Sequence, residues 1–290
     1  MGPTAAGKTS LAIELAKHFN TEIISADSRQ CYKELNIGVA RPSSEQLQKV
    51  KHHFINSHSI HEEVNAKVFE EFSLKKINKI FAQHDTAVMV GGTGLYVKAF
   101  CEGMDEMPVI DKSIRKTIVT NYNNGGYEWL RDEVEKKDPI FYSKGEIKNP
   151  QRMIRALEVK FSTGKSIIEF HSHKKNSAGR DFTIVKIGLE LPKEQLHQNI
   201  NTRVDDMMNA GLLKEVKDLY SFKNLNALQT VGYKELIDHL EGTFLLDEAI
   251  EKIKINTRHY AKRQLTWFKK DKDIKWFKPN AVADIIQWLQ

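Results

Sequence analysis

The chain opens on a complete phosphate-binding loop, Gly2-Pro3-Thr4-Ala5-Ala6-Gly7-Lys8-Thr9, with the spacing G-x-x-x-x-G-K-[ST]. Glycine lets the backbone wrap closely around phosphate oxygens, and successive N–H groups and the N-terminus of the next helix then point at the anion. Lys8 adds a positive charge, and the Thr9 hydroxyl is suited to a Mg²⁺ ion, partly through water. The loop predicts an anion site but does not say whose phosphate it holds.

A phosphate loop normally follows a buried strand, whereas here only Met1 precedes Gly2. Strands usually run about five residues. We therefore expect the first strand to be absent or supplied differently, and we do not expect Met1 alone to form an ordinary strand.

Short apolar runs alternate with helical patterns along most of the chain. Strands are expected at 22–27, 85–90 and 185–189, and helices at 8–18, 43–51, 66–84 and 194–209. This alternation predicts a parallel α/β sheet. Because ligands of such sheets bind beyond the carboxyl ends of the strands, Asp27 and residues 91–96 are expected to face the phosphate loop.

Residues 111–180 show a different pattern, in which helical segments replace strands. Helices are expected at 112–122, 127–137 and 149–162, and a polar, basic loop at 171–180. The sequence therefore predicts a core built from 1–110 and 181–290, with a phosphate-loop α/β fold and a helical C-terminal part, into which a helical domain of residues 111–180 is inserted.

Composition limits the partners and the compartment. The 290 residues carry a formal net charge of +6 and only two cysteines, and no apolar run is long enough to cross a membrane. We therefore expect a cytoplasmic protein with no disulfide framework and no membrane contact. Residues 251–290 hold ten Lys and Arg against four Asp and Glu, with aromatic residues between them. Such a surface suits nucleic acid, although an ordinary solvated helix face would look the same.

Asp27 is the main candidate for acid–base chemistry, since it ends a predicted strand beside the loop. A turn-forming Asp is the competing interpretation. The strand at 88–90 ends in Gly-Gly-Thr and lacks the second carboxylate that ATPases and GTPases use for Mg²⁺, which argues against a motor or switch. Arg152 and Arg155 share one helix face and could clamp phosphate, or form a surface salt-bridge face.

Several segments together resemble the tRNA dimethylallyltransferases of bacterial type, which isopentenylate adenosine beside the anticodon. The matching segments keep the order of the family and span nearly the whole chain: Gly2–Thr9, Ser25–Tyr32, Gly38–Pro42, Gly91–Tyr96, Asn149–Glu158, Gln229–Glu235 and Thr257–Trp267. Val39 and Arg41 depart from the residues that the family shows more often, Thr and Lys. The long C-terminal zinc-finger extension of eukaryotic members is not found.

The resemblance implies a role for each matching site. The loop would hold the diphosphate of dimethylallyl diphosphate rather than ATP, with Lys8, Thr9, Arg203 and Mg²⁺ neutralising the leaving group. Asp27 would be the general base for the adenine N6 amine. Contacts with the tRNA anticodon stem-loop would come from Asp27, Ser28, Arg29, Gln30, Thr93, Arg115, Gln151, Arg152, Met153, Ile154, Arg155, Gln229, Thr230, Val231, Gly232, Tyr233, Lys234, Arg258, Lys262 and Arg263, within segments that include Thr257–Gln264. The protein is expected to act as a monomer.

Three other functions stay open on the sequence. A small-molecule kinase would share the phosphate loop but would not need the basic, aromatic C-terminal helix. A transferase acting on free AMP, ADP or ATP would share the loop and Asp27 but would have less use for Gln151–Arg155. A non-catalytic RNA-binding protein would not need an intact Lys8, Thr9 and Asp27.

Overall fold

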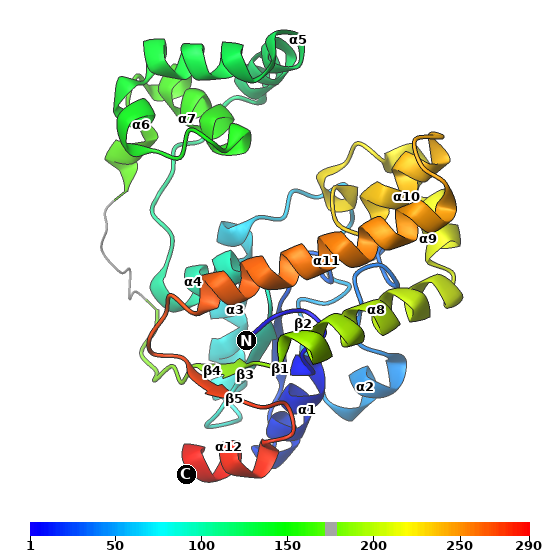
Figure 1. Cartoon of the computed structure of the whole chain (residues 1–290). Coiled ribbons are helices and arrows are strands. Elements are labelled where there is room, and N and C mark those ends of the chain that lie inside the picture. Colours follow the sequence, from blue (N-terminus) through cyan, green and yellow to red (C-terminus); the bar gives the residue numbers. More distant parts are fainter. Residues whose placement is uncertain (172–178) are drawn as a thin grey trace. The chain divides into compact units, whose positions relative to one another are not determined.

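The computed structural model describes residues 1–171 and 179–290, which form two compact units (Figure 1). One unit, here called the core, comprises Met1–Glu102 and Ser177–Gln290, and the other, the insertion, comprises Gly103–Asn176. The expected boundaries at 111 and 180 fall near these positions. Most of the expected loop at 171–180 lies outside the described residues. Within the described ranges, no helix has both the length and the apolar character needed to cross a membrane.

The core contains two small parallel sheets. The first has the order β2-β1-β3 and is formed by β1 (Ile23–Ala26), β2 (His52–His53) and β3 (Val88–Gly91). The second pairs β4 (Ile187–Leu189) with β5 (Lys275–Phe277). All three expected strands are confirmed, although each is shorter than its apolar run. The sequence did not predict β2 or β5, which are too short to show a periodic pattern.

Met1 lies beside β4. Its amino group donates to the Ile187 carbonyl at 2.6 Å, and the Leu189 N–H donates to the Met1 carbonyl at 2.9 Å, which is the bonding pattern of one parallel strand residue. Among the described residues no strand element precedes the loop, and Met1 alone makes these two strand-type hydrogen bonds. An apolar cavity of about 350 Å³ lies next to Met1, lined by residues of β3 and by Ile187 of β4.

Four helices are described in the first half of the core, and the sequence predicted the first three of them. They are α1 (Lys8–His18), α2 (Ser44–Lys49), α3 (Ala66–Phe81) and α4 (Gly94–Glu102). Gly7 precedes α1 with φ 78°, a conformation that glycine adopts at little cost. The apolar face of α1 packs on β1 and β3 through Ala12, Ile13 and Ala16. The sheet and α1 therefore fix the end of the loop rigidly.

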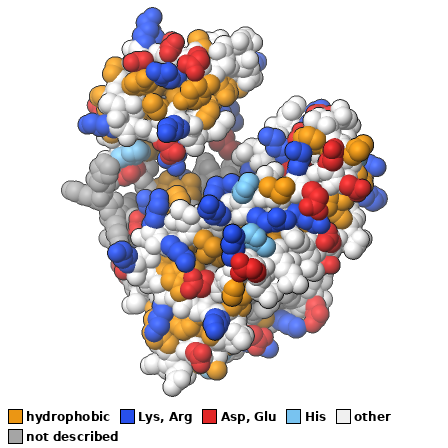
Figure 2. Space-filling model, in the orientation of Figure 1, with side chains coloured by type: hydrophobic (Ala, Val, Ile, Leu, Met, Phe, Trp, Pro, Cys, Tyr) orange, Lys and Arg blue, Asp and Glu red, His pale blue; other side chains and the backbone are white. Residues whose placement is uncertain are grey.

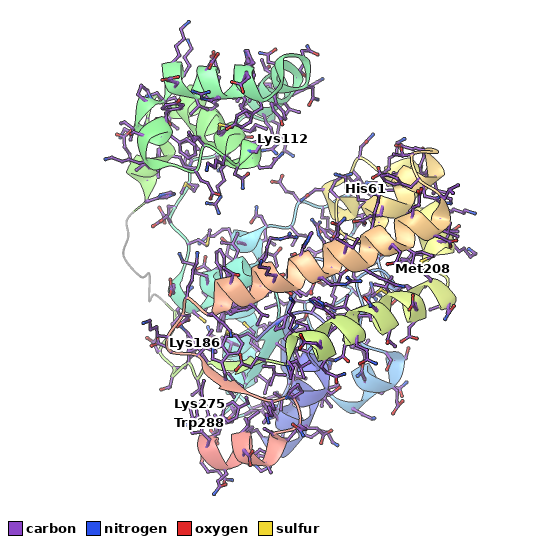
Figure 3. The ribbon with its side chains drawn as sticks, viewed as in Figure 1. His61, Lys112, Lys186, Met208, Lys275 and Trp288 are labelled. Carbon is purple, nitrogen blue, oxygen red and sulfur yellow. The ribbon has the colours of Figure 1, made fainter. Side chains whose placement is uncertain are left out.

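The second half of the core is helical, as expected. It contains α8 (Lys193–Asn209), α9 (Leu212–Asp218), α10 (Tyr233–Leu240), α11 (Leu246–Phe268) and α12 (Val282–Leu289), with 3₁₀ turns at Tyr220–Phe222 and Asn226–Leu228. Helices α8 and α11 run side by side and pack on the loop, since Leu196, Ile200 and Ala261 share one buried cluster with Ala5 (Figure 1). Lys275 of β5 lies over the ring of Trp288 of α12, with 4.7 Å between Nζ and the ring centroid (Figure 3).

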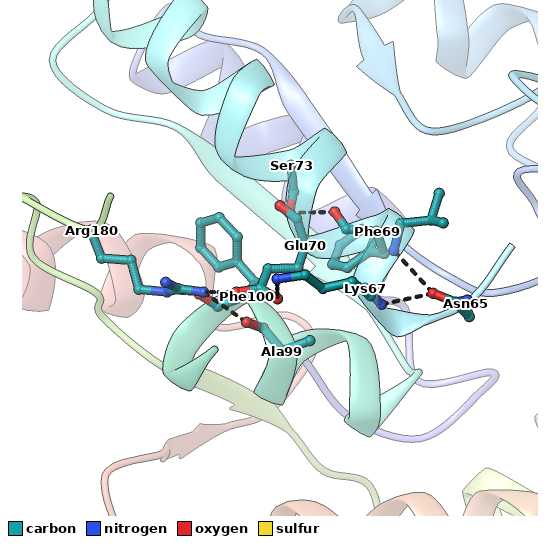
Figure 4. Close-up of polar contacts among 9 residues, drawn as sticks. Asn65, Lys67, Phe69, Glu70, Ser73, Ala99, Phe100 and Arg180 are labelled. Carbon is teal, nitrogen blue, oxygen red and sulfur yellow. Dashed lines mark hydrogen bonds and ion pairs between the residues drawn. The ribbon is translucent and has the colours of Figure 1, made fainter. Parts of the chain in front are cut away.

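A buried ion pair joins the end of α4 to α3 (Figure 4). Arg180 Nη2 lies 2.7 Å from Glu70 Oε1. The same guanidinium donates to the carbonyls of Ala99 and Phe100, so it caps the C-terminal turn of α4. Arg180 thereby fixes the chain where it re-enters the core.

The insertion is a small helical unit with its own apolar core. Its helices are α5 (Lys112–Lys137), α6 (Pro139–Lys144) and α7 (Pro150–Thr163), and a 3₁₀ turn follows at Ile167–Phe170. Gly126 interrupts α5 with φ 69°, which explains why the sequence showed two helical patterns there. Met153 and Ile154 are fully buried in this core, together with Leu130 and Leu157. Their side chains therefore pack the insertion and are not exposed for contact with tRNA.

Candidate active site

One polar cavity of about 290 Å³ brings together the main sequence candidates. It is lined by Thr4–Ser10 of the loop, by Asp27, and by Arg203 of α8, with Gly91, Gly92, Tyr260 and Gln264 on its other sides. The expectation that Asp27 and the turn after β3 face the loop is confirmed. The parallel arrangement of β1 and β3 accounts for it, because both strands end at the same edge of the sheet.

Side chains from α8 and α11 hold the loop from outside. Asn199 donates to the Ala5 carbonyl at 3.2 Å, and the Thr4 N–H donates to Gln264 Oε1 at 2.8 Å. Arg203 Nη1 lies 3.4 Å from Thr4 Oγ1. Three polar contacts from distant parts of the sequence therefore hold the loop, and the loop motif itself does not predict them.

Lys8 and Arg203 line this cavity, as does Arg41. Burial, with Arg203 acting in the same direction and Asp27 opposing, lowers the pKa of Lys8 to about 8. Burial also lowers the pKa of Arg203. Both shifts express the cost of placing positive charge in a site shielded from water. A bound anion would reduce that cost, so the site suits a polyanion.

Asp27 forms a turn and lines the cavity at the same time. Its Oδ1 accepts hydrogen bonds from the N–H groups of Arg29 at 2.9 Å and Gln30 at 3.2 Å. The two interpretations of Asp27 are thus compatible, because one carboxylate oxygen fixes the turn. This rigid attachment is what a positioned base needs.

Thr93 and Tyr260 lie next to Asp27. The Thr93 hydroxyl accepts from the Ser28 N–H at 3.1 Å, which joins the turn after β3 to the turn after β1. Burial, with the nearby Asp27 carboxylate acting in the same direction, raises the pKa of Tyr260 to about 12, and a hydrogen bond to Thr93 opposes the shift. Tyr260 therefore stays a neutral phenol at neutral pH.

Two glycines of the turn after β3 are packed closely by side chains of α11. A Cβ on Gly92 would lie 2.2 Å from Gln264 Nε2, and one on Gly94 would lie 2.3 Å from the Trp267 ring. In the structure these glycines let α11 approach the turn.

Several residues that were expected to contact tRNA form hydrogen bonds to other residues of the core instead. The side-chain amide of Gln30 donates to the carbonyls of Val39 and Ala40, and Arg258 Nη2 donates to Asn201 at 3.0 Å. Tyr233 is fully buried, and its hydroxyl donates to Glu215. These side chains hold loops in place; Tyr233 offers no surface to a partner, and Gln30 and Arg258 are half-buried.

Other residues of the expected tRNA set differ in their exposure on the core. Lys262, Arg263, Gln229 and Lys234 are exposed, whereas Thr230 and Val231 are half-buried and Gly232 is buried. Figure 2 shows Lys and Arg side chains gathered on the face that carries α11. Arg29 donates to the Asn226 carbonyl at 2.6 Å, so segment 229–234 follows a turn that touches the Asp27 turn.

Two arginines of the insertion pair with one buried carboxylate. Glu158 is 3% exposed and pairs with Arg115, which is 51% exposed, and with Arg155, which is 39% exposed. Gln151 accepts from Arg115 Nη2 at 3.4 Å, and Arg152 pairs with the exposed Glu146. Sequence reasoning missed Glu158, although an acidic residue three positions after Arg155 inside an apolar helix pattern was a usable signal.

A site for Mg²⁺ would have to be built from Thr9 and from ligand oxygens. Within the described residues, no group of three or more His, Cys, Asp and Glu is placed to hold a metal ion. Thr9 lines the polar cavity, and Mg²⁺ in phosphate sites takes few protein ligands besides phosphate oxygens and water. The residues present are therefore compatible with a metal that arrives with a diphosphate.

Fold and site together define an α/β transferase in which a phosphate loop faces a fixed carboxylate. A family model described as "IPP transferase" matches residues 30–271, and the chain belongs to this family. It is 44% identical over its full length to a tRNA dimethylallyltransferase of Cytophaga hutchinsonii, covering 95% of that protein. It is 48% identical to that of Flavobacterium johnsoniae over 96% of this chain and 91% of the relative.

A solved structure gives the same result. The tRNA isopentenylpyrophosphate transferase of Bacillus halodurans superposes with a TM-score of 0.73 at 34% sequence identity, over 99% of this chain and 93% of the other. The resemblance stated from sequence motifs is thus confirmed at the level of family and fold.

Proposed function

We propose that this protein transfers the dimethylallyl group of dimethylallyl diphosphate to the N6 amine of the adenosine on the 3′ side of the anticodon in tRNA, releasing diphosphate. The single observation that carries the proposal is the polar cavity, where the Gly2–Thr9 loop, Arg203 and Asp27 meet. The names of the relatives support the group transferred and the acceptor.

The loop side of the cavity suits the leaving group. Backbone N–H groups at the start of α1, together with Lys8 and Arg203, would bind the diphosphate and stabilise the charge that develops as the C–O bond breaks. Mg²⁺, when bound near Thr9, would neutralise part of the same charge. No nucleotide is hydrolysed in this reaction, which accounts for the lack of a second carboxylate at the end of β3.

Asp27 suits the acceptor side. The N6 amine attacks the allylic carbon, the new C–N bond replaces the C–O bond to diphosphate, and the proton lost from N6 passes to the Asp27 carboxylate. Oδ1 is committed to the turn, so Oδ2 is the oxygen we assign to the proton. A base held in fixed geometry contributes about 10²–10⁴-fold to such a rate.

Exposed cations of both units suit the tRNA backbone. Lys262 and Arg263 lie on the outer side of α11, and Arg115, Arg152 and Arg155 lie on the surface of the insertion. Arginine binds phosphate in a bidentate manner, and each contact adds a salt-dependent share of affinity. The adenosine must leave its stack to reach the cavity, which costs a few kcal/mol.

A transfer assay with three acceptors tests the proposal. Labelled dimethylallyl diphosphate and Mg²⁺ are incubated with the protein and tRNA, AMP or ATP, and the labelled nucleoside is identified after digestion. We expect label only in tRNA, on the adenosine 3′ to the anticodon. Label in AMP or ATP at a comparable rate would identify a transferase of free nucleotides, and phosphorylation without prenyl transfer would identify a kinase.

A further inference from the structure

Gln264 is a buried polar side chain on the inner face of α11. It is 6% exposed and lies on the stripe that also carries Ala261 and Phe268, both buried. A polar residue on an apolar stripe loses its contacts with water and must be hydrogen-bonded to be tolerated. Both the oxygen and the nitrogen of its side-chain amide form hydrogen bonds to backbone groups of the protein.

The partners belong to the two sides of the polar cavity. Oε1 accepts from the Thr4 N–H of the phosphate loop at 2.8 Å, and Nε2 donates to the Gly92 carbonyl at 2.9 Å. Gly92 precedes Thr93, whose hydroxyl accepts from the Ser28 N–H next to Asp27. One side chain therefore bridges the loop to the turn that is fastened to the Asp27 segment.

The surroundings are built to admit this amide. A Cβ on Gly92 would lie 2.2 Å from Gln264 Nε2, so no larger residue fits at 92 while the amide stays in place. Thr4 also carries the contact with Arg203, at 3.4 Å. The loop residue that Gln264 holds is thus the one that contacts a cation of the cavity.

We infer that Gln264 is a positioning residue for the diphosphate loop, an inference that rests on the proposed function. It sets the separation between the loop, which binds the leaving group, and the Gly92–Thr93 turn, which fixes the Asp27 side. It reaches the reaction through Thr4 and Gly92 and does not itself touch the reacting atoms. The resemblance grouped Gln264 with tRNA contacts, and its burial assigns it to the opposite face of the helix.

Gln264→Leu removes both hydrogen bonds while keeping the approximate size of the side chain. We expect KM for dimethylallyl diphosphate and Kd for inorganic diphosphate to rise by roughly tenfold, as for loss of a buried hydrogen bond. Affinity for tRNA should not change, since Lys262 and Arg263 are untouched. Gln83→Leu, at an exposed glutamine after α3, is the matched control and should alter neither constant.

Gly92→Ala tests the same contact from the other side and leaves Gln264 in place. The new methyl group must displace the amide, so this variant should show the same rise in KM for dimethylallyl diphosphate. In Gly92→Ala/Gln264→Ala the clash is removed, and the double variant should be no worse than Gln264→Ala alone. Additive losses in the double variant would contradict the inference.

Two results separate this inference from the proposed function. If wild type binds inorganic diphosphate and Lys8→Met does not, the loop is the diphosphate site, and unchanged constants in folded Gln264→Leu then overturn the positioning role. If Lys8→Met binds diphosphate as well as wild type does, the loop assignment itself is wrong. Thermal unfolding of each variant shows whether it is folded, and Gly92→Ala carries the test if Gln264→Leu is not.

Discussion

Both units place arginine beside a buried glutamate, but only the insertion leaves the arginine accessible. In the core, Arg180 is 4% exposed and its partner Glu70 is 3% exposed. In the insertion, Glu158 is equally buried, whereas its partners Arg115 and Arg155 are about half exposed. An Arg–Glu pair of the same kind therefore stabilises the packing of the core but leaves the arginine charge exposed to solvent in the insertion. Burial of the cation separates the two uses.

The largest effect on stability should follow from breaking the core pair. Arg180→Met leaves the buried Glu70 carboxylate with Lys67 as its remaining ion-pair partner among the described residues, and it uncaps the end of α4. We expect the free energy of unfolding to fall by about 3 kcal/mol, the lower end of the range for an uncompensated buried charge. Urea denaturation followed by circular dichroism measures it.

Arg131→Met is the control for that variant. Arg131 pairs with Glu128 in the insertion, and both side chains are well exposed. Its stability should change by less than about 1 kcal/mol. Equal losses in the two variants would remove the distinction between buried and exposed arginines.

The next largest effect should be a difference between the two units in how ligand affinity depends on pH. The pKa of Lys8 is lowered to about 8, chiefly by burial, so the free protein loses this charge as the pH rises through 8. Affinity for dimethylallyl diphosphate should then fall by up to about tenfold per pH unit above that point. Arginine stays charged over this range, so affinity of the insertion arginines for tRNA should stay constant.

Calorimetric titration with each ligand between about pH 7 and pH 9.5 checks this, within the range where arginine stays protonated. Lys8→Arg should abolish the fall in diphosphate affinity. Parallel declines for the diphosphate and for an anticodon stem-loop would show that the pH effect does not arise at Lys8.

The smallest effect is expected at Arg152. This side chain is 58% exposed and pairs with an exposed Glu146, so Arg152→Ala should leave the free energy of unfolding nearly unchanged. Affinity for tRNA should fall severalfold, and the slope of log K against log salt concentration should decrease by roughly 1. Filter binding at several salt concentrations measures both, and an unchanged slope would place Arg152 outside the tRNA surface.

The fold was largely readable from periodicity, because α1, α3, α8 and α11 are long enough to show it. The strands β2 and β5 were missed because their pairing is set by tertiary contacts. The two helical patterns around Gly126 were predicted correctly, since the backbone leaves the helical conformation at that residue. In the site, the loop and Asp27 could be predicted because each is defined by residues that are close together in the sequence. Gln264 acts across a long sequence separation, and local pattern gives no partner for it. Glu158 has a distant partner in Arg115 and a local one in Arg155, and only the local pair could have been predicted.

The most direct test of the account is the single-turnover transfer rate of Asp27→Asn with labelled dimethylallyl diphosphate, Mg²⁺ and tRNA. Asparagine keeps an oxygen that can accept from the Arg29 and Gln30 N–H groups, so the turn should persist while the base is lost. We predict a rate lower by about 10²–10⁴-fold with unchanged affinity for both substrates. A rate close to that of wild type would contradict the assignment of Asp27 as the base.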